Sequence, residues 1–569
     1  MEKGAIAHIT MIMSQKQNKL FSIFGFLSSL GIIAFGQPAR LGWLGALASV
    51  LGFAIFFCTL PSQLAKKTKF LISASWFAVV QMIQLSWMTS IEFQGYYVIA
   101  VYSIVAIGLA LQFGLLSLFV PSEGKISSGR ILLCASIWTM MEWMRLFVLC
   151  GFSWNPVGLS LTHFIPALQF TSLFGVYGLS FWVMMTNLWA VNVWRMGLKR
   201  NQTIAWASLA CFPYFFGMAQ LAHHFPKSKA EQNKLNVALI QTALLPTEKS
   251  PHAERIREFI PPFEQWRKIF QFLKEKQRTA WDLIVLPEAA VPLLSDLSFY
   301  RLSSVRELMT SELGNGIEQK FPSLVYPYAE ERNIDGVNVW LVSNLFLCQT
   351  LANHYQAEVV AGLDHSERKE GKNYNSAFCL SPNSHTHQRY DKQVLLPLAE
   401  YLPFDFLRPL TKKYGIFDFF TPGTESKVFG SKIPFSVAIC YEETFAEIMR
   451  DGRDKGAKLF INVTNDNYYP HSTLHEQHFY HARLRAVENG TPLVRACNSG
   501  VTAAIDSLGR TLGRFNPETR STRAQEGALS CHLTAYQYFT LFSFWGEAGI
   551  ISICMIITLC YYRLRKNCL

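Results

Sequence analysis

Residues 433–445 read IPFSVAICYEETF, and this stretch decides the fold of the second half of the chain. Its apolar run, with the β-branched residues Val437 and Ile439, predicts a buried strand. The strand ends at a single cysteine, Cys440, and Glu442 follows two residues later. A cysteine at a strand end is a nucleophile only as the thiolate, so it needs a base or a positive charge nearby.

Two other stretches carry groups that can serve this thiol. Residues 282–291, DLIVLPEAAV, form an apolar strand that ends at Glu288. Residues 389–402, RYDKQVLLPLAEYL, place Lys392 and Glu400 beside a short apolar run. The three stretches together contain the groups that acyl transfer through a thioester requires.

Each of these groups has an expected role. Glu288 would take the proton of the Cys440 thiol and later that of an attacking amine. Lys392, together with the backbone N–H of Tyr441, would stabilise the tetrahedral oxyanion. Glu400, eight residues after Lys392, would hold the ammonium group in place.

The composition of the chain indicates a membrane protein. Half of its 569 residues are hydrophobic and only 16% are charged, whereas soluble domains carry about 25% charged residues. Acidic residues are almost absent before residue 225, and the composition from 226 to 535 is that of a soluble α/β domain. The net charge of +12 could suit nucleic acid, but the basic residues lie between apolar runs, so we expect no nucleic-acid partner.

Eight apolar runs have lengths suited to membrane-spanning helices. They lie at about 20–38, 41–60, 70–91, 93–120, 131–152, 164–194, 203–222 and 538–562. We therefore predict a transmembrane domain of seven helices (1–225), a soluble catalytic domain (226–535) and a C-terminal transmembrane helix with its tail (536–569).

Basic residues follow every second run, which predicts the orientation of the protein. The basic segments contain Lys3, Lys16 and Lys19; Lys66, Lys67 and Lys69; Lys125 and Arg130; Arg195, Lys199 and Arg200; and Arg563, Arg565 and Lys566. These segments would face the cytoplasm. The soluble domain would then lie on the outer side, which is the periplasm in a cell with two membranes.

The soluble part alternates predicted strands with predicted helices, which indicates an α/β fold. Strands are expected at 235–244, 281–291, 357–363, 374–380, 433–440, 457–463, 492–497, 501–506 and 528–533. Helices are expected at about 252–278, 343–356, 443–452 and 472–489. Residues 293–340 have no clear period and are interpreted as a long, partly irregular insertion.

Two groups of polar residues each allow two interpretations. Glu142 and Arg145 lie three residues apart in the fifth run, where they could form an ion pair or contact a phospholipid headgroup. The histidines at 471, 475, 478 and 481 could form a metal site or a polar helix face. Their spacing lacks the HExxH pattern and the twelve cysteines include no CxxC pair, so we predict no metal site.

Five phenylalanines follow Glu400 and are either part of the core or a flexible aromatic loop at the bilayer surface. They are Phe404, Phe406, Phe417, Phe419 and Phe420.

In this combination the motifs resemble the apolipoprotein N-acyltransferase family, a membrane-embedded branch of the nitrilase superfamily. The matching segments are VLPEAAVP, YNSAFCL, RYDKQVLLPLAEYLPF, AICYEETF, INVTNDNYY, HARLRAVENGTPLVRACNSGVTAAID, EWMR and GFSWNPVG. One departure is the segment 240–252, IQTALLPTEKSPH, which lacks the Gly-Asn pair and the Lys-Trp common in the family.

The resemblance implies an αββα nitrilase domain on about eight transmembrane helices in a bacterial inner membrane. It implies a catalytic triad of Glu288, Lys392 and Cys440, with Glu400, Tyr441 and Glu442 in support. The expected reaction transfers an acyl chain from a phospholipid, through a thioester, to the N-terminal amine of the diacylglyceryl-cysteine of lipoproteins. No cofactor is expected.

Two alternatives remain open from the sequence. A membrane-tethered amidase of the nitrilase type would pass the acyl group to water instead of an amine, because the triad alone does not choose the acceptor. A non-catalytic scaffold or transport protein would carry the same domain without using it.

Overall fold

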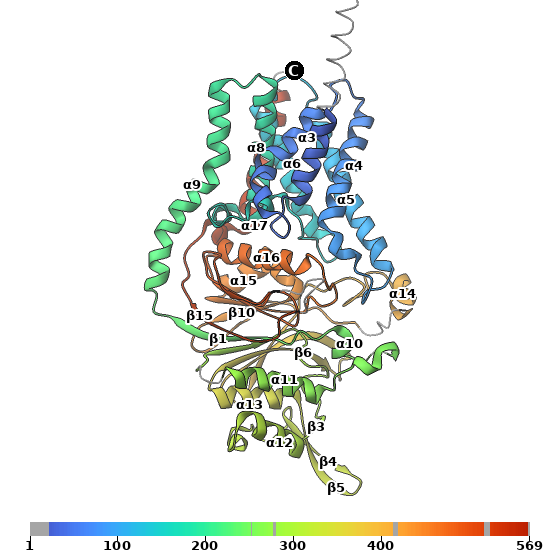
Figure 1. The fold of residues 1–569 in the computed structure, drawn as a ribbon, viewed down its shortest axis with the longest axis vertical. Helices are drawn as coiled ribbons and strands as arrows, with labels where there is room; N and C mark the ends of the chain where they lie inside the picture. Colours follow the sequence, from blue (N-terminus) through green and yellow to red (C-terminus); the bar gives the residue numbers. More distant parts are fainter. Residues whose placement is uncertain (1–21, 252, 277–279, 414–418, 517–523, 567–569) are drawn as a thin grey trace, which may run out of the picture.

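A computed structural model of the chain describes residues 22–251, 253–276, 280–413, 419–516 and 524–566. The predicted basic start of the chain and Phe417 lie outside the described residues. A bundle of helices stands on a domain of two sheets, and the two parts share one broad contact (Figure 1).

The bundle is built from the apolar runs. Its helices are 22–35, 42–59 (which includes α2, Gly45–Leu47, and α3, Phe53–Thr59), α4 (Lys66–Gln84), α5 (Tyr97–Phe119), α6 (Ser128–Met144), α8 (Thr171–Arg195), α9 (Arg200–Ala230) and α17 (Leu541–Lys566). Among the described helices, five are long and apolar enough to cross a membrane: 42–59, α5, α8, α9 and α17. The other three predicted spans correspond to the helix at 22–35, α4 and α6, which are shorter or less apolar. The count of eight membrane crossings therefore stays a prediction.

The basic loops gather at the end of the bundle that lies away from the sheets. Lys69 donates hydrogen bonds to the Val120 carbonyl and, over 3.1 Å, to Ser122 Oγ. Arg195 donates to the carbonyl of Pro121 over 3.0 Å. The C-terminal end of α17 lies at the same end of the bundle (Figure 1). This arrangement agrees with the predicted placement of the basic loops on one side of a membrane and the sheet domain on the other.

Two six-stranded sheets form the second part. The first has the order β15-β1-β2-β6-β7-β8 and the second the order β14-β13-β12-β11-β10-β9. The strands of the first are β1 (Lys234–Gln241), β2 (Leu283–Leu286), β6 (Glu358–Glu367), β7 (Lys372–Leu380), β8 (His387–Asp391) and β15 (Gly527–Thr534). Those of the second are β9 (Val428–Phe429), β10 (Phe435–Ile439), β11 (Leu459–Thr464), β12 (Leu493–Cys497), β13 (Ala503–Ile505) and β14 (Thr511–Arg514).

The sheets pack face to face and helices cover both outer faces. Apolar side chains of β1, β2 and β6 meet those of β10, β11 and β12 in one core. The helices α11 (Pro262–Glu275) and α13 (Asn344–Tyr355) cover the first sheet, and α15 (Ala446–Asp454) and α16 (Leu474–Asn489) cover the second. The domain is therefore the αββα sandwich that the resemblance implied, and all nine predicted strands are present.

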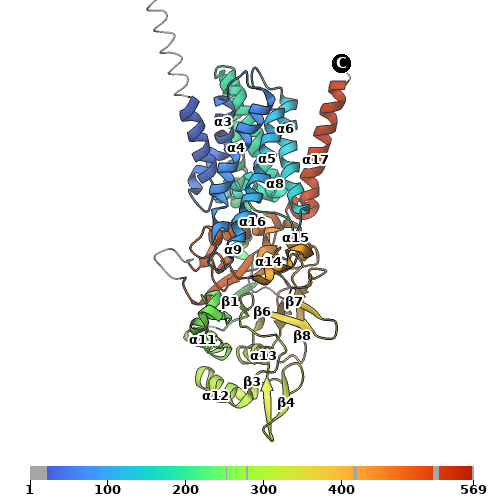
Figure 2. The same ribbon diagram turned by 90° about the vertical axis from the view of Figure 1, so that its right-hand side faces the viewer.

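The insertion 293–340 is more regular than predicted. It contains α12 (Leu302–Leu313) and a small sheet of order β3-β5-β4, with strands β3 (Tyr300–Arg301), β4 (Ala329–Ile334) and β5 (Val337–Val342). The sequence of this segment shows no clear hydrophobic period, because the elements are short and β4 is exposed on both faces for most of its length. Figure 2 shows the insertion at the end of the molecule farthest from the bundle.

Two bundle helices are broken where they meet the sandwich. In α8 the break is at Gly175, whose φ is 63°, and the next amide, Val176 N–H, donates to Glu488 of α16 over 2.8 Å. In α17 the break is at Gly546, and Glu547 N–H donates to Glu447 of α15 over 2.9 Å. Two carboxylates of the sandwich therefore cap two helices of the bundle.

Candidate active site

Cys440 lies on a sharp turn at the end of β10. Its φ is 56°, in a region that residues other than glycine rarely adopt. Its carbonyl accepts hydrogen bonds from Asn462 Nδ2 over 3.1 Å and contacts a ring nitrogen of His478 at 3.2 Å. These contacts fix the turn and leave the half-buried sulfur at the sheet edge.

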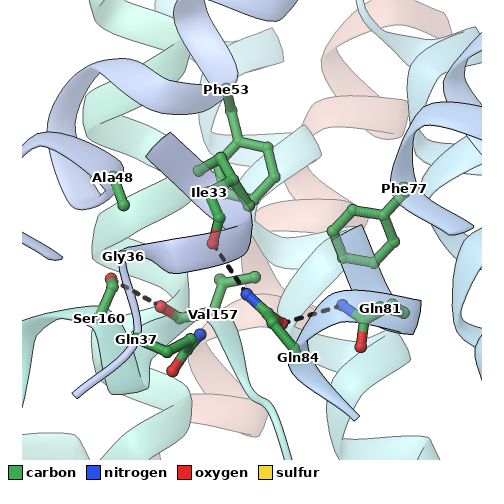
Figure 3. Close-up of a pocket in the computed structure, with 10 residues that line it drawn as sticks. All are labelled: Ile33, Gly36, Gln37, Ala48, Phe53, Phe77, Gln81, Gln84, Val157 and Ser160. Atoms are coloured by element: carbon green, nitrogen blue, oxygen red, sulfur yellow. Dashed lines mark hydrogen bonds between the residues drawn. The ribbon is translucent and has the colours of Figure 1, made fainter. Parts of the chain in front are cut away.

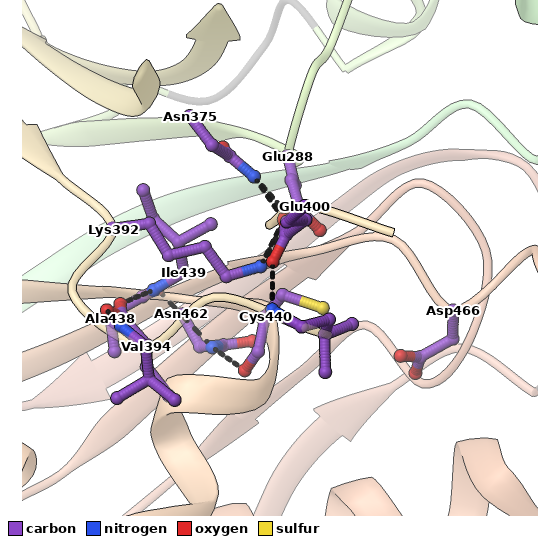
Figure 4. A network of polar contacts seen from close by, with 12 residues as sticks. Glu288, Asn375, Lys392, Val394, Glu400, Ala438, Ile439, Cys440, Asn462 and Asp466 are labelled. Atoms are coloured by element: carbon purple, nitrogen blue, oxygen red, sulfur yellow. Dashed lines mark hydrogen bonds and ion pairs between the residues drawn. The ribbon is translucent and has the colours of Figure 1, made fainter. Parts of the chain in front are cut away.

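Lys392 lies between two carboxylates (Figure 4). Its Nζ is 2.7 Å from Glu400 Oε1 and 3.3 Å from Glu288 Oε1. Asn375 Nδ2 donates to the same two oxygens over 3.1 Å and 2.7 Å. Figure 4 shows the side chain of Cys440 beside this cluster. The three residues predicted as a triad, and the supporting Glu400, therefore come together in space.

The electrostatics of the cluster follow from burial and pairing. Burial works to lower the pKa of Lys392, but Glu400 and Glu288 raise it well above its usual value, so this lysine stays cationic. Burial, and then the Glu288 carboxylate, raise the pKa of the Cys440 thiol well above its usual value. The positive charge of Lys392 acts in the opposite direction and lowers this pKa. The thiol is therefore neutral at rest and has a base and a cation beside it.

Close backbone packing positions the two glutamates. Glu288 lies two residues after the end of β2, and a Cβ at Gly362 of the neighbouring strand β6 would lie 2.6 Å from Glu288 Cα. Glu400 is fixed by a turn in which its Oε2 accepts from Leu396 N–H over 2.8 Å and its own N–H donates to the Leu396 carbonyl over 2.8 Å.

Glu442 joins the nucleophile turn to the Lys392 loop. Its Oε1 accepts from the backbone N–H groups of Gln393 and Val394, over 2.5 Å and 3.1 Å. Its Oε2 accepts from Ile439 N–H over 2.7 Å and from the Tyr390 hydroxyl over 2.9 Å. The side chain is fully buried, so its support is structural: it holds the Cys440 turn and the Lys392 loop together.

Tyr441 turns its side chain toward the bundle. Its ring stacks on Trp154 with centroids 5.9 Å apart, and its hydroxyl donates to the Gly151 carbonyl over 3.1 Å. Thr444 on the same turn and Ser153 share a hydrogen bond of 2.5 Å. The turn that carries the thiol therefore lies against the outer loop of the membrane domain.

The histidines after residue 470 are mostly buried rather than forming a polar face. His478 contacts Asp466 Oδ1 at 2.9 Å and Glu443 Oε1 at 3.1 Å, and Arg495 reaches the same Glu443 oxygen over 2.5 Å. Among the described residues, no three His, Cys, Asp or Glu side chains are arranged to hold a metal ion. The network reaches the carbonyl of Cys440 through His478, so it contributes to fixing the Cys440 turn.

Sequence reasoning missed Asn375, which bridges Glu288 and Glu400. It lies in β7, within the segment YNSAFCL, and is 5% exposed. Its strand also carries Lys372, Asn373 and Ser376, so the amide does not stand out in the sequence. Its partners lie 87 and 25 residues away in the chain.

The aromatic loop after Glu400 is divided between the two interpretations. Phe404 and Phe406 are exposed and stack on each other with centroids 5.6 Å apart. Phe419 and Phe420 are half-buried. The exposed pair, Phe404 and Phe406, is thus available to contact lipid, and the half-buried pair, Phe419 and Phe420, packs partly against the protein.

The charged pair in the bundle is an internal contact. Arg145 and Glu142 are both buried, with Nη1 and Oε1 4.0 Å apart. Glu142 accepts from Trp138 Nε1 over 2.9 Å, and Arg145 donates to Gln112 over 2.7 Å. The geometry favours the ion pair over headgroup contact, because the Arg145 side chain is only 6% exposed.

A separate cavity of about 10 Å³ lies within the bundle and is lined by polar and apolar side chains (Figure 3). Gln84 donates to the Ile33 carbonyl over 2.9 Å and accepts from Gln81 over 3.4 Å. Asn155 donates to Gln81 over 3.2 Å. These amides pair with one another and with backbone, as polar groups buried between membrane helices must.

Comparison with known proteins gives a consistent result. The profile of the carbon-nitrogen hydrolase family matches residues 236–526, and that of the apolipoprotein N-acyltransferase N-terminal domain matches residues 25–189. The chain is 30% identical to the apolipoprotein N-acyltransferase of Chlamydia pneumoniae and 29% identical to that of Chlamydia caviae. Each alignment covers 94% of this chain and 96% of the relative.

Among solved structures, the sandwich is similar to an amidase from Nesterenkonia sp. AN1, with 15% identity and a TM-score of 0.33 over 53% of this chain and 92% of the amidase. It is also similar to Nit3 of Saccharomyces cerevisiae, with 19% identity and a TM-score of 0.34 over 55% of this chain and 94% of Nit3.

Proposed function

The chain belongs to the apolipoprotein N-acyltransferase family, and on that premise we propose how its own residues carry out the transfer. It is a membrane-embedded acyltransferase with a nitrilase-type catalytic domain. We propose a phospholipid as the acyl donor, the N-terminal amine of a diacylated lipoprotein as the acceptor, and Cys440 as the residue that carries the acyl group between them.

In the first half-reaction the Cys440 sulfur attacks the ester carbonyl of the phospholipid. Glu288 takes the thiol proton as the C–S bond forms. Lys392 stabilises the oxyanion of the tetrahedral intermediate. The C–O bond then breaks, Glu288 returns the proton to the leaving oxygen, and a lysophospholipid departs.

In the second half-reaction an amine attacks the thioester carbonyl. The C–N bond forms and the C–S bond breaks, so that the lipoprotein gains an amide and Cys440 regains its thiol. Glu400 and Asn375 keep Lys392 and Glu288 in place through both steps, and Glu442 keeps the two loops together.

The observation that carries this proposal is the position of Lys392. The Lys392 side chain is 1% exposed, and its Nζ lies 3.3 Å from Glu288 and 2.7 Å from Glu400. It lies near the turn that carries Cys440 (Figure 4). A buried cation held by two carboxylates beside a thiol suits oxyanion stabilisation better than a purely structural role.

The location of the site suits a lipid donor. The turn that carries Cys440 contacts the outer loop of the bundle through Tyr441 and Thr444. Both parts of the protein also carry exposed apolar residues, namely Phe147 and Val148 on the bundle and Phe404 and Phe406 on the sandwich. We propose that the catalytic domain lies on the periplasmic face of the inner membrane, with the aromatic pair at the bilayer surface.

Intact-mass analysis tests the intermediate. The purified protein mixed with phospholipid alone is expected to gain the mass of one acyl chain, and the Cys440→Ala variant is expected to gain none. Cys150→Ala is the matched control, because this half-buried thiol lies on the neighbouring outer loop, and it should retain the added mass. Acylation of a diacylated lipopeptide by the Cys440→Ala variant would contradict the mechanism, and release of free fatty acid without lipopeptide product would indicate a hydrolase.

A further inference from the structure

A third carboxylate faces the candidate site. Asp364 lies on β6, two residues beyond Gly362, so its side chain is on the face of the strand that touches Glu288. In the sheet register it is directly opposite Asn375, and side chains in such pairs have Cβ atoms about 5 Å apart. Asp364 therefore lies beside the amide that bridges Glu288 and Glu400.

Asp364 and Asn375 both have an acceptor without a donor. Within the described part of the chain, the carboxylate of Asp364 makes no hydrogen bond or ion pair. The Oδ1 atom of Asn375 is buried and also lacks a partner there. Its amide orientation is fixed, because Nδ2 donates to two glutamates. A buried acceptor such as Asn375 Oδ1 is normally satisfied, and the partly exposed Asp364 carboxylate lies beside it. A donor from outside the protein is therefore expected between them.

The charges around this position favour a cation. Glu288, Glu400 and Asp364 provide three carboxylates, and Lys392 and a second buried lysine, Lys249, provide two ammonium groups. Lys249 Nζ donates to the Glu288 carbonyl over 3.3 Å. When all five groups are ionised, one negative charge remains in excess, and this count is the same for the free thiol and for the thioester because both are neutral.

We propose that Asp364 and Asn375 Oδ1 form the subsite that binds the ammonium group of the acceptor, an inference that rests on the function proposed above. A primary ammonium carries three donors and one positive charge, which match the two free acceptors and the excess carboxylate. Asp364 thereby determines which acceptor the acyl-enzyme takes. Water is uncharged, so the Asp364 carboxylate does not strengthen its binding as it strengthens that of an ammonium group.

The proton balance of the second half-reaction follows. The acceptor nitrogen enters with three hydrogens, and its first proton passes to Asp364 and then to solvent. The neutral amine forms the C–N bond, and Glu288 takes the second proton. Glu288 gives that proton to the Cys440 sulfur as the C–S bond breaks, which leaves a secondary amide and a free thiol.

The titration of Asp364 suits this role. Burial, and then the charge of Glu288, raise the pKa of Asp364 to about 7, while Lys249 opposes them. The groups that face Asp364 are Glu288, Glu400, Lys249, Lys392 and Tyr468. Since an α-amino group has a pKa of about 7.7–8.0, carboxylate and ammonium coexist just above neutral pH, where a proton can pass between them.

The test separates the two half-reactions in the full-length protein in detergent. Acyl-enzyme formation from phosphatidylglycerol and, separately, from phosphatidylethanolamine is followed by intact mass. The acyl-enzyme is then mixed with a diacylated lipopeptide or with hydroxylamine, an amine that is uncharged at neutral pH. Asp364→Asn is expected to form acyl-enzyme at a rate within about twofold of the wild type, and to raise the KM for the lipopeptide about tenfold or more. Its reaction with hydroxylamine should be unchanged.

Three controls accompany this variant. Asp364→Glu keeps the charge and should recover most of the lipopeptide KM. Asp282→Asn removes a half-buried carboxylate at the opposite end of β2, where it pairs with Lys432, and should match the wild type. If Asp364→Asn does not fold, Asp364→Ser is measured in the same way.

Two results would overturn the proposal. One is a lipopeptide KM for Asp364→Asn within about twofold of the wild type. The other is a slower acyl-enzyme formation that appears only with phosphatidylethanolamine, since Asp364 would then bind the donor's headgroup ammonium. Failure of the wild type to form any acyl-enzyme would instead refute the function on which the inference rests.

Discussion

Glu442 illustrates how one buried carboxylate can fix the geometry of a site. It accepts four hydrogen bonds from two loops that are separated by about fifty residues in the chain. One of those loops carries Lys392 and the other carries Cys440. A side chain that touches neither reacting atom therefore controls the distance between the cation and the thiol.

Replacing Glu442 with Gln should disrupt this support. An amide offers one acceptor oxygen in place of two, so about two backbone N–H groups lose their partner, at about 1.5 kcal/mol each. We expect the free energy of unfolding to fall by about 3 kcal/mol and acyl-enzyme formation to slow. Denaturant unfolding and intact mass measure the two effects. Glu425→Gln, at an exposed carboxylate beside Lys455, is the control, and equal behaviour of the two variants would show that Glu442 has no such role.

At the scale of elements, the broken helices α8 and α17 join the membrane bundle to the sandwich. Each break has a glycine with positive φ, and each new helix start is capped by a carboxylate from the catalytic domain. A Cβ at Gly546 would lie 2.5 Å from Glu447 Oε1 of α15, and a Cβ at Gly175 would lie 3.1 Å from Glu488 Oε1 of α16. The breaks therefore allow close packing between the bundle and α15 and α16, directly beside the sheet that carries Cys440.

The cap at α8 should make stability depend on pH. Burial raises the pKa of Glu488 to about 7 from an ordinary value of 4.5. Between these values the folded protein binds a proton that the unfolded chain has lost, so the contribution of Glu488 to stability decreases as the pH rises. We expect the Tm of Glu488→Gln, relative to the wild type, to increase by about 2 °C or more from pH 5 to pH 8.

Thermal unfolding followed by tryptophan fluorescence in detergent measures this difference. Glu476→Gln is the matched control on the same helix, since Glu476 pairs with Arg514 near the surface. A constant difference in Tm between the Glu488 variant and the wild type across this pH range would refute the expectation.

At the scale of the whole molecule, the sandwich depends on the bundle for part of its core. Leu484 and Val487 of α16 are fully buried against Leu159, Leu168 and other bundle residues. The membrane domain thus covers this part of the α16 surface. The active site is therefore held at the membrane by its own packing as well as by the chain connections.

A fragment of residues 231–535 should show this dependence. Without the bundle, α16 exposes a contiguous apolar surface, which favours aggregation. We expect the fragment to aggregate in buffer and to disperse in detergent, as measured by size-exclusion chromatography. The same fragment with Leu484→Glu and Val487→Lys should be more soluble, and a monomeric unsubstituted fragment in buffer would contradict the expectation.

The sequence by itself determined the parts of this protein that local patterns encode. Apolar runs and basic loops predicted the helical segments and their orientation, the strand and helix periods predicted the sandwich, and the motifs around Glu288, Lys392 and Cys440 predicted which residues meet. Residues buried on one face of a helix or strand recur at a fixed spacing along the chain. These patterns can therefore be recognised in the sequence alone.

Only the tertiary structure decided how the site is completed. Asn375 and Asp364 come from paired strands, Lys249 follows β1, and the loops that Glu442 joins are distant in sequence. The order within the insertion 293–340 and the breaks at Gly175 and Gly546 likewise emerged only on folding. The physical reason is that these contacts are set by strand register and by packing between domains, which bring single polar residues together without leaving a period in the sequence.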